Sequence, residues 1–257
     1  NFAKENNIPF VIDYRDMWPE VFYDLFPRSL RIIPKIIFYP MSQKLNRVLK
    51  NSDAIVSVTK NILDFALART GGIKNDLNDF FPLGYKRLEI SANEISLQSK
   101  YWNSQNIFED DGYIKFCFFG TIGYQCDFEI LINAFNILSD QKIKLIICGS
   151  GDKTKKLKKL AEKNDNIILP GFMNHEQLTY LMKISDFGLC PQYPEDSWLN
   201  SIPGKAIQYM SEGLPILTSL DKGLLGNLIN NKGFGLTYKS ENLQSLLLTL
   251  NNAIKDS

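Results

Sequence analysis

The sequence is poor in the residues that most often bind metals or form disulfides. It has one histidine and four cysteines among 257 residues. Cys117, Cys126, Cys148 and Cys190 show no Cys-x-x-Cys spacing, and three of them lie in or beside apolar runs typical of strands. We therefore expect no metal site, and thiols that act as small core residues in a reducing cytoplasm. The single histidine, His175, falls at the start of a predicted helix, where a capping or surface role is expected rather than catalysis.

Long apolar runs and an excess of either charge are also lacking. No uninterrupted apolar run reaches the roughly 18 residues that a membrane helix needs, and no secretory signal opens the chain. Lysine and arginine total 29 against 28 acidic residues, which gives no reason to expect nucleic acid as a partner. The chain begins with Asn1 rather than methionine, so we expect a fragment of a longer cytoplasmic protein.

Short apolar runs alternate with segments of helical period, the pattern of parallel strands joined by helices. The predicted fold class is therefore α/β. Residues 1–90 form a first, incomplete domain, 91–111 a polar linker with room for a short helix, and 112–257 a second domain. The second domain has six predicted strands, which makes it doubly wound and Rossmann-like. They are Ile114–Phe119, Ile143–Cys148, Ile167–Leu169, Phe187–Cys190, Pro215–Thr218 and Phe234–Tyr238, with helices at Phe128–Leu138, Thr154–Lys163, Glu176–Ile184, Pro203–Glu212, Leu224–Asn230 and Leu243–Ile254.

The first domain has only two clear strands, Pro9–Asp13 and Ala54–Val58, and a third near Leu77–Phe81. Its predicted helices are Ser42–Lys50 and Asn61–Arg69. Three strands cannot form a covered parallel sheet alone, so we expect its beginning to lie outside this sequence.

Glycines follow two predicted strands of the second domain just before a helix. They lie in Gly120-Thr121-Ile122-Gly123 and in Gly149-Ser150-Gly151. Glycine lets a ligand approach the backbone, and the free amides of a following helix suit a phosphate. The alternative is that these glycines only form tight turns, since short glycine motifs often occur without a ligand.

A third segment, Asn200 to Pro215, places Pro203 and Lys205 at a predicted helix start. The amides of Ser201 and Ile202 would lie at that positive helix end. Acidic residues are preferred there, so a lysine suggests that an anion shares the site. The alternative is a lysine that points to water.

With these segments in order, the chain resembles the retaining family 4 glycosyltransferases of GT-B fold, particularly bacterial ones that build surface polysaccharides. The resemblance covers residues 9 to about 238. It depends on the following pieces: Asp13-Tyr-Arg15-Asp16-Met-Trp-Pro19, Ser52 to Val58, Phe119 to Gly123, Ile147 to Gly151, Gly171 to Met173, Ser185 to Leu189, Ser201 to Lys205 and Tyr209 to Pro215.

The resemblance implies two Rossmann-like domains and a nucleotide-sugar site in the second one. Gly120 to Gly123 and the Ser201 to Lys205 helix start would hold the diphosphate and sugar, with Lys205 as the catalytic cation. Phe172 and Met173 would contact the base, and Gly149 and Gly151 would line the site. Asp13, Arg15 and Asp16 would border the acceptor-side cleft. No cofactor or metal is implied.

Two departures from the family pattern affect the predicted donor site. The usual two glutamates are replaced by Asn200 and Gln208, which can bond hydroxyls without the strength of a charge. In the Gly120 loop many relatives carry an arginine and a lysine for the pyrophosphate, whereas this chain offers Thr121 and Gln125 nearby, which leaves Lys205 as the main candidate cation. The acceptor-side histidine of many relatives would lie before Asn1 or is absent.

The resemblance therefore implies a retaining transferase that moves a sugar, expected from a UDP-sugar, to a glycan or lipid-linked acceptor. A binding module without turnover is the alternative, because the two carboxylates are amides. A GT-B epimerase is a further alternative, but it needs acidic and histidine groups that this chain lacks.

One segment also suggests peripheral contact with an anionic membrane. Between Arg28 and Ser52 there are apolar residues and six cations, with no acidic residue. The cations are Arg28, Arg31, Lys35, Lys44, Arg47 and Lys50. The alternative is a solvated helix that covers its own core, since Pro34 and Pro40 interrupt any long amphipathic helix. Lys153 to Lys163, by contrast, reads as a plain solvated face.

Overall fold

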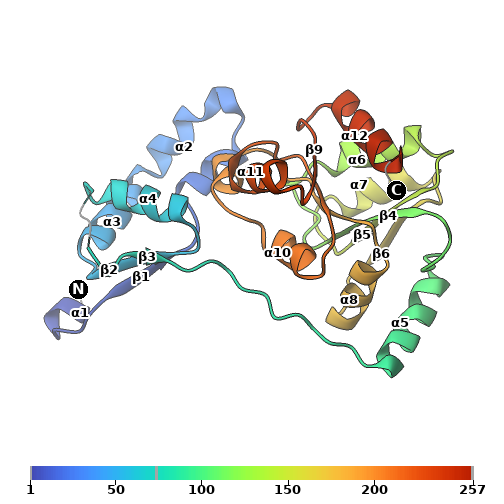
Figure 1. The fold of residues 1–257 in the computed structure, drawn as a ribbon. Coiled ribbons are helices and arrows are strands. Elements are labelled where there is room, and N and C mark those ends of the chain that lie inside the picture. The colour runs from blue at the N-terminus through green and yellow to red at the C-terminus, as the bar shows by residue number, and fades with distance from the viewer. Residues whose placement is uncertain (1, 73–74, 256–257) are drawn as a thin grey trace. The chain divides into compact units, whose positions relative to one another are not determined.

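The computed structural model describes residues 2–72 and 75–255, apart from the side chains of Leu25 and Arg28. The chain divides into two compact units. The N-terminal unit comprises the residues up to Gly84 together with Glu195–Ser201. The C-terminal unit comprises Tyr85–Pro194 and the residues from Ile202 onward. Each unit has its own parallel sheet (Figure 1). Each also has its own cluster of buried hydrophobic side chains.

The C-terminal unit contains a sheet of six parallel strands in the order β6-β5-β4-β7-β8-β9. The chain winds outward from β4 to β6 and then returns to place β7 beside β4, so the sheet is doubly wound, as predicted. Ligands of such sheets bind beyond the carboxyl ends of the strands, where this reversal occurs. The strands are β4 (Ile114–Phe119), β5 (Ile143–Cys148), β6 (Ile167–Gly171), β7 (Phe187–Cys190), β8 (Ile216–Thr218) and β9 (Gly235–Thr237).

All six helices predicted after residue 112 are present. They are α6 (Phe128–Ile137), α7 (Thr154–Ala161), α8 (His175–Lys183), α10 (Gly204–Ser211), α11 (Gly223–Lys232) and α12 (Leu243–Lys255). Helices pack on both faces of this sheet, α6, α7 and α12 on one and α10 on the other. The predicted ends differ from the observed ones by at most two residues, which is the usual scatter of helix boundaries.

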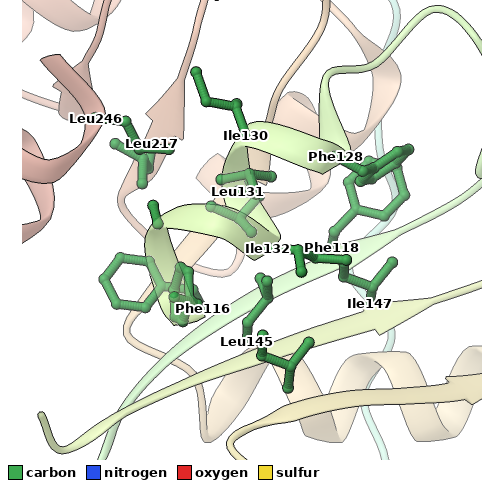
Figure 2. Close-up of a cluster of buried hydrophobic side chains, with 14 of the residues drawn as sticks. Phe116, Phe118, Phe128, Ile130, Leu131, Ile132, Leu145, Ile147, Leu217 and Leu246 are labelled. Atoms are coloured by element: carbon green, nitrogen blue, oxygen red, sulfur yellow. The ribbon is translucent and has the colours of Figure 1, made fainter. Parts of the chain in front are cut away.

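Alternating side chains of β4 divide the core between the two faces. Phe116 and Phe118 belong to the cluster formed with α6, α7 and α12, and both are fully buried (Figure 2). On the other face, the ring of Phe119 packs edge to face against Tyr209 of α10, with centroids 5.0 Å apart. The Tyr209 hydroxyl donates to the Cys117 carbonyl at 3.2 Å. These contacts fix α10 against the carboxyl half of β4.

Residues 91–111, predicted as a linker, contain the helix α5 (Ala92–Ser104). A capping box of Ser91 and Glu94 begins this helix. Trp102 is fully buried, and its indole Nε1 donates to the Gln177 carbonyl in α8 at 3.1 Å. The segment therefore packs within the C-terminal unit, because one tryptophan anchors an otherwise polar stretch.

Two lysines are buried at the amino ends of the central strands. The side chains of Lys115 and Lys144 are 3% and 9% exposed, and both pair with Asp111, at 2.9 and 2.7 Å. They also donate to three backbone carbonyls. Burial alone would raise the pKa of Asp111, but the hydrogen bonds from Lys144 and Lys115 outweigh it and hold that pKa below its ordinary value. Asp111 thus neutralises two ammonium groups that are shielded from water.

The N-terminal unit contains three parallel strands in the order β1-β2-β3, near the predicted positions. Tyr14, Leu49, Ile55 and Ile62 lie in its core. Thr59 caps α4 by accepting a hydrogen bond from the Ile62 amide. The elements are α1 (Phe2–Glu5), β1 (Val11–Tyr14), the 3-10 helices Glu20–Leu25 and Arg28–Leu30, α2 (Ile32–Ile37), α3 (Tyr39–Lys50), β2 (Ala54–Ser57), α4 (Lys60–Arg69), β3 (Asp79–Phe80) and α9 (Asp196–Leu199).

Two prolines divide the basic segment into separate helices. The predicted helix Ser42–Lys50 begins earlier, at Tyr39, and α2 precedes it without having been predicted. Pro34 and Pro40 lie in the first turns of α2 and α3. Backbone amides in a first turn have no carbonyl acceptor within the helix, so proline removes no hydrogen bond there. The prolines therefore prevent one long helix, as expected, and two short helices form instead.

Within residues 2–72 and 75–255, no helix combines the length and apolar character needed to cross a bilayer. The same residues contain no group of three ligand-type side chains placed to hold a metal ion. All four cysteines are buried and free, which confirms their predicted place in the core.

Candidate functional site

The loops that follow β4 and β5 are joined backbone to backbone at the carboxyl edge of the six-stranded sheet. The Gly120 amide donates to the Cys148 carbonyl at 3.0 Å, and the Ile122 amide donates to the Ser150 carbonyl at 2.9 Å. A third loop joins them, because the Gly149 amide donates to the Gly171 carbonyl at 2.7 Å. The two glycine segments found in the sequence are thus direct neighbours.

This close approach explains why the second loop needs glycine. At Gly149 the backbone has a φ of +130°, and a Cβ there would lie 1.9 Å from the Gly120 carbonyl oxygen. A Cβ on Gly151 would lie 2.2 Å from the Ile122 carbonyl oxygen. Packing between loops therefore accounts for both glycines without a ligand, a structural reason beyond the tight turn considered from the sequence.

Gly120 faces Lys205 instead of another backbone. Its φ is +132°, and the position of a Cβ on it would lie 3.5 Å from Cε and 3.6 Å from Nζ of Lys205. The Lys205 ammonium lies 4.5 Å from the centroid of the buried Phe118 ring. None of the ion pairs among the described residues involves Lys205. An unneutralised cation thus lies beside an open glycine turn.

Lys205 is held there by the start of α10. Pro203 is the residue before the first helical turn, so the helix begins at Gly204, one residue later than predicted. The Ala206 amide already bonds the Pro203 carbonyl at 2.9 Å. The amides at the positive helix end are therefore those of Gly204 and Lys205, and not those of Ser201 and Ile202 as the sequence suggested. A helix end and an ammonium together favour an anion such as a phosphate.

A cavity of about 330 Å³ opens at the same edge of the sheet. Its volume falls in the range of small-molecule pockets. The side chain of Phe172 is 82% exposed at its rim, whereas Met173 is buried and accepts a hydrogen bond from the Tyr101 hydroxyl at 3.3 Å. The lining residues are Phe119, Gly120, Thr121, Cys148, Gly149, Ser150, Phe172, Met173 and Leu178.

The cavity contains no reactive thiol. Burial raises the pKa of Cys148 well above its usual range, so the thiol stays protonated. A protonated thiol is a poor nucleophile, which makes covalent catalysis by this residue unfavourable. This edge of the sheet therefore offers a ligand the charge of Lys205, the free backbone amides at the start of α10 and the shape of the cavity.

Four of the lining residues were not predicted from the sequence: Phe119, Cys148, Ser150 and Leu178. Phe118, whose ring contacts the Lys205 ammonium, was not predicted either. A signal for the first three existed, because they end strands or stand between the predicted glycines. Leu178 is a helical residue of α8, and only the packing of that helix places it at the cavity.

Gln125 and Thr121 belong to the first glycine loop. A Cβ on Gly123 would lie 2.4 Å from Oε1 of Gln125, so this amide folds back onto the loop. Thr121 is exposed at the cavity. Gln208 lies in α10 of the same unit. Ile202 also belongs to this unit and precedes α10 in the sequence.

The remaining donor-site candidates, Asn200 and Ser201, belong to the N-terminal unit. The Asn200 carboxamide accepts from Asn61 at 2.9 Å and donates to the Asp196 carbonyl at 2.8 Å. The Thr59 hydroxyl donates to the Asn200 carbonyl at 2.8 Å, and Ser201 bonds the Ser197 carbonyl at 2.7 Å. Both side chains are therefore engaged locally.

The acceptor-side candidates lie at and just beyond the carboxyl end of β1. Arg15 pairs with Asp13 at 2.6 Å, and both side chains are largely exposed. Asp16 is also exposed. An exposed pair of this kind adds little stability, so these charges are available to a ligand.

The N-terminal unit has a polar cavity of its own, of about 460 Å³. Arg31, one of its lining residues, pairs with Glu195 at 2.5 Å and with Asp24 at 3.4 Å. Burial, together with the charge of Glu195, raises the pKa of Asp24 to about 6. Arg31 is thus committed to carboxylates and does not contribute a free cation to the basic segment.

His175 is the exposed first residue of α8. Asn174 caps this helix by a capping box with Gln177, so the predicted capping role falls to its neighbour. The histidine keeps the predicted surface position.

The family model of the glycosyl transferases group 1 matches residues 102–257, which is more than half of the chain. The chain belongs to the group 1 glycosyl transferases. The matched region covers the six-stranded sheet, the glycine loops and Lys205.

Individual proteins and solved structures are also similar to this chain. An uncharacterized glycosyltransferase of Methanocaldococcus jannaschii is 29% identical over 187 residues, which cover 68% of this chain and 43% of the relative. HepE of Anabaena, solved in complex with UDP and glucose, matches with a TM-score of 0.69 at 17% identity, over 99% of this chain and 64% of that one. WaaG, a glycosyltransferase involved in lipopolysaccharide biosynthesis, matches with a TM-score of 0.59 at 17% identity, over 78% and 53%.

The fold is thus α/β with parallel sheets of three and six strands, and it matches the GT-B glycosyltransferase structures. This group 1 chain spans less than half of the M. jannaschii relative and under two thirds of HepE.

Proposed function

We propose that the protein containing this chain transfers a sugar from a nucleotide diphosphate, a UDP-sugar, to a glycan or a lipid-linked acceptor in surface-polysaccharide synthesis, with retention of anomeric configuration. The observation that carries the proposal is Lys205 at the start of α10, against the open turn of Gly120 and beside the cavity. HepE has been solved with UDP and with UDP-glucose, which supports a nucleotide-sugar donor for this fold.

In this proposal the diphosphate lies between the Gly120 to Gly123 loop and the first amides of α10. Lys205 neutralises the charge that develops on the departing diphosphate. The base occupies the cavity between Phe172 and Met173, with the exposed Phe172 ring available for stacking. Gly149 and Gly151 hold the neighbouring loop against this site, and Thr121 and Gln125 offer neutral hydrogen bonds to it.

The transfer step needs no strong base from the protein. The acceptor oxygen forms a bond to the anomeric carbon on the face from which the phosphate departs, and the bond from that carbon to the phosphate oxygen breaks. The acceptor proton passes to the departing phosphate oxygen. Stabilising that leaving group is then the main contribution of the chain, and one such donor typically contributes roughly 10²–10³ in rate.

Asn200 and Gln208 are proposed to bind sugar and ribose hydroxyls as amides, and Asp13, Arg15 and Asp16 to border the acceptor. Amides supply orientation without a charge-assisted bond. Their hydrogen bonds would be weaker than those of two glutamates, which leaves a nucleotide-sugar binding module without turnover as the alternative function.

The test is to measure nucleotide binding and sugar transfer on the full-length protein. We expect UDP to bind more tightly than free uridine, and UDP to be released from a UDP-sugar in the presence of a lipid-linked or glycan acceptor. Proton NMR of the product would give the same anomeric configuration as the donor. UDP binding with no release for any sugar would favour the binding module, and no affinity for any nucleoside diphosphate would reject both.

A further inference from the structure

Gln192 carries a fully buried carboxamide in the loop that follows β7. The residue is 0% exposed, and neither Nε2 nor Oε1 has a hydrogen-bond partner among the described residues. A carboxamide can donate two hydrogen bonds and accept two, so leaving them unmade inside a protein lowers its stability. Because buried polar groups are ordinarily paired, this exception calls for an explanation.

The backbone of Gln192, by contrast, is held from two sides. Its carbonyl accepts a hydrogen bond from the Ser219 hydroxyl at 2.5 Å. Its main chain also forms an antiparallel bridge with Cys126. The next amide, of Tyr193, donates to the Gln125 carbonyl at 3.0 Å. The loop is thus fixed to the segment that follows the Gly120 turn, and only the side chain of Gln192 lacks partners.

This loop lies where the strand order of the six-stranded sheet reverses. Strand β7 pairs with β4, whose other neighbour is β5. Ligands of doubly wound sheets bind at this point, beyond the carboxyl ends of the strands. Gly120 directly follows β4, and Gln192 follows the end of β7 by two residues. Both therefore belong to the edge of the sheet that carries the candidate donor site.

Lys205 lies near the same segments. Burial raises the pKa of Cys126 to about 11 and that of Cys190 to about 12, and the Lys205 charge opposes this at both thiols. A charge that acts on both thiols lies close to both, and Gln192 is bridged to one and two residues from the other. The ammonium has three hydrogens to donate, while the contact described for it is with the Phe118 ring.

We infer that Gln192 positions Lys205 in the nucleotide-bound protein: its carboxamide oxygen accepts a hydrogen bond from the ammonium and holds it toward the diphosphate. A neutral acceptor suits this role, because a carboxylate would neutralise the charge that stabilises the leaving group. The unpaired carboxamide is then retained for function although it lowers stability. The inference rests on the proposed function, since it assigns a positioning residue to the same donor site.

The test compares stability with turnover in Gln192→Met, an apolar side chain of similar length and volume. Because this change removes an unpaired polar group, we expect the unfolding temperature without nucleotide to rise by about 2–4 °C. We expect kcat for UDP release by the full-length protein to fall about tenfold to a hundredfold, because the ammonium is no longer held in place.

Thr218→Val is the matched control. The Thr218 hydroxyl is also fully buried, but it donates to the Cys190 carbonyl at 2.7 Å and accepts from the Leu220 amide at 3.1 Å. Its loss should lower the unfolding temperature, because it leaves bonded groups without partners. We expect kcat per folded molecule to stay near that of the unmodified protein. The two variants should therefore change stability in opposite directions.

Two further variants test whether Gln192 acts through Lys205. In a Lys205→Ala background, Gln192→Met should cause no further loss of kcat, because residues that act as a unit are not additive. Gln192→Glu keeps an acceptor for the ammonium but adds a negative charge. It should therefore weaken UDP binding by about tenfold or more and raise KM more than it lowers kcat.

A lower unfolding temperature for Gln192→Met would show that the carboxamide is bonded within the fold, and would overturn the inference. Unchanged kcat in that variant would overturn it as well, and so would an equal loss of kcat with and without Lys205. These outcomes concern a protein that binds UDP. An unmodified protein without affinity for UDP would reject the proposed function, and the inference with it.

Discussion

Replacing Lys205 by alanine separates a role in transfer from a role in folding. The structure gives this lysine two possible functions. Its ammonium lies 4.5 Å from the Phe118 ring centroid, which stabilises the fold through a cation–π contact. It also lies beside the Gly120 turn, where it can neutralise a diphosphate.

The two functions predict losses of different size. A cation–π contact is worth about 0.5–1 kcal/mol at a partly exposed site, so the free energy of unfolding should fall by about 1 kcal/mol. Loss of one donor that stabilises a departing charge costs about 3–4 kcal/mol in the transition state, or roughly 10²–10³ in kcat. We therefore expect turnover to fall far more than stability.

The assay is UDP release by the full-length protein, with urea unfolding of the same preparations. Lys205→Arg should restore only part of the activity, because a planar guanidinium replaces a compact ammonium poorly at a crowded phosphate. Lys158→Ala, at an exposed position of α7, is the control and should leave both quantities near their original values. If Lys205→Ala keeps near-normal kcat and UDP affinity, the assignment of Lys205 is refuted. The same holds if any activity loss is fully accounted for by unfolded protein.

Three further changes test the fold around the sites. Gly149→Ala should destabilise the protein by about 2–3 kcal/mol, since its new methyl would lie 1.9 Å from a carbonyl oxygen; Gly171→Ala has a positive φ but open space, and urea unfolding should show a smaller loss. Asp111→Asn should cost about 3 kcal/mol, because it leaves two buried ammonium groups without their carboxylate. The lowered pKa of Asp111 means that its stabilising charge is present at neutral pH and lost as pH falls through that pKa, so the variant should lack this acid dependence in thermal unfolding; an unchanged dependence would contradict the pairing. The pKa of Asp24 is raised to about 6, so its contribution to stability is full at acid pH and is lost as pH rises through 6. Asp24→Asn should therefore raise the unfolding temperature above that of the unmodified protein at pH above 6, and not at acid pH. A lower unfolding temperature at both pH values would contradict this and show that Arg31 needs the Asp24 carboxylate.

The sequence by itself determined the six strands of the C-terminal unit and the six helices that follow them in the chain after residue 112. Apolar runs such as Ile143–Cys148 can be satisfied only as buried parallel strands, and the 3.6-residue period between them requires helices, so both appear where predicted. The glycine turns at Gly120 and Gly149 were visible for the same local reason. Each follows a strand directly, which places it at the ligand-binding edge of a doubly wound sheet.

Only the tertiary structure decided which of these residues meet. Gly149 requires glycine because of the carbonyl of Gly120, and Lys205 lies against Phe118, in both cases through contacts between segments far apart in the sequence. The same holds for Asn200, whose amide is bonded to Asn61 and which belongs to the N-terminal unit.

The isoleucines of α2, Ile32, Ile33, Ile36 and Ile37, are exposed although they lie in a helix, and they show the same limit. An apolar residue in a helical period is ordinarily a core residue, and nothing local distinguishes one that is covered from one that is exposed. That difference depends on which side of the helix packs, and here Pro34 occupies the buried side. Local periodicity thus fixes the elements, while burial and the pairing of distant side chains depend on how those elements pack.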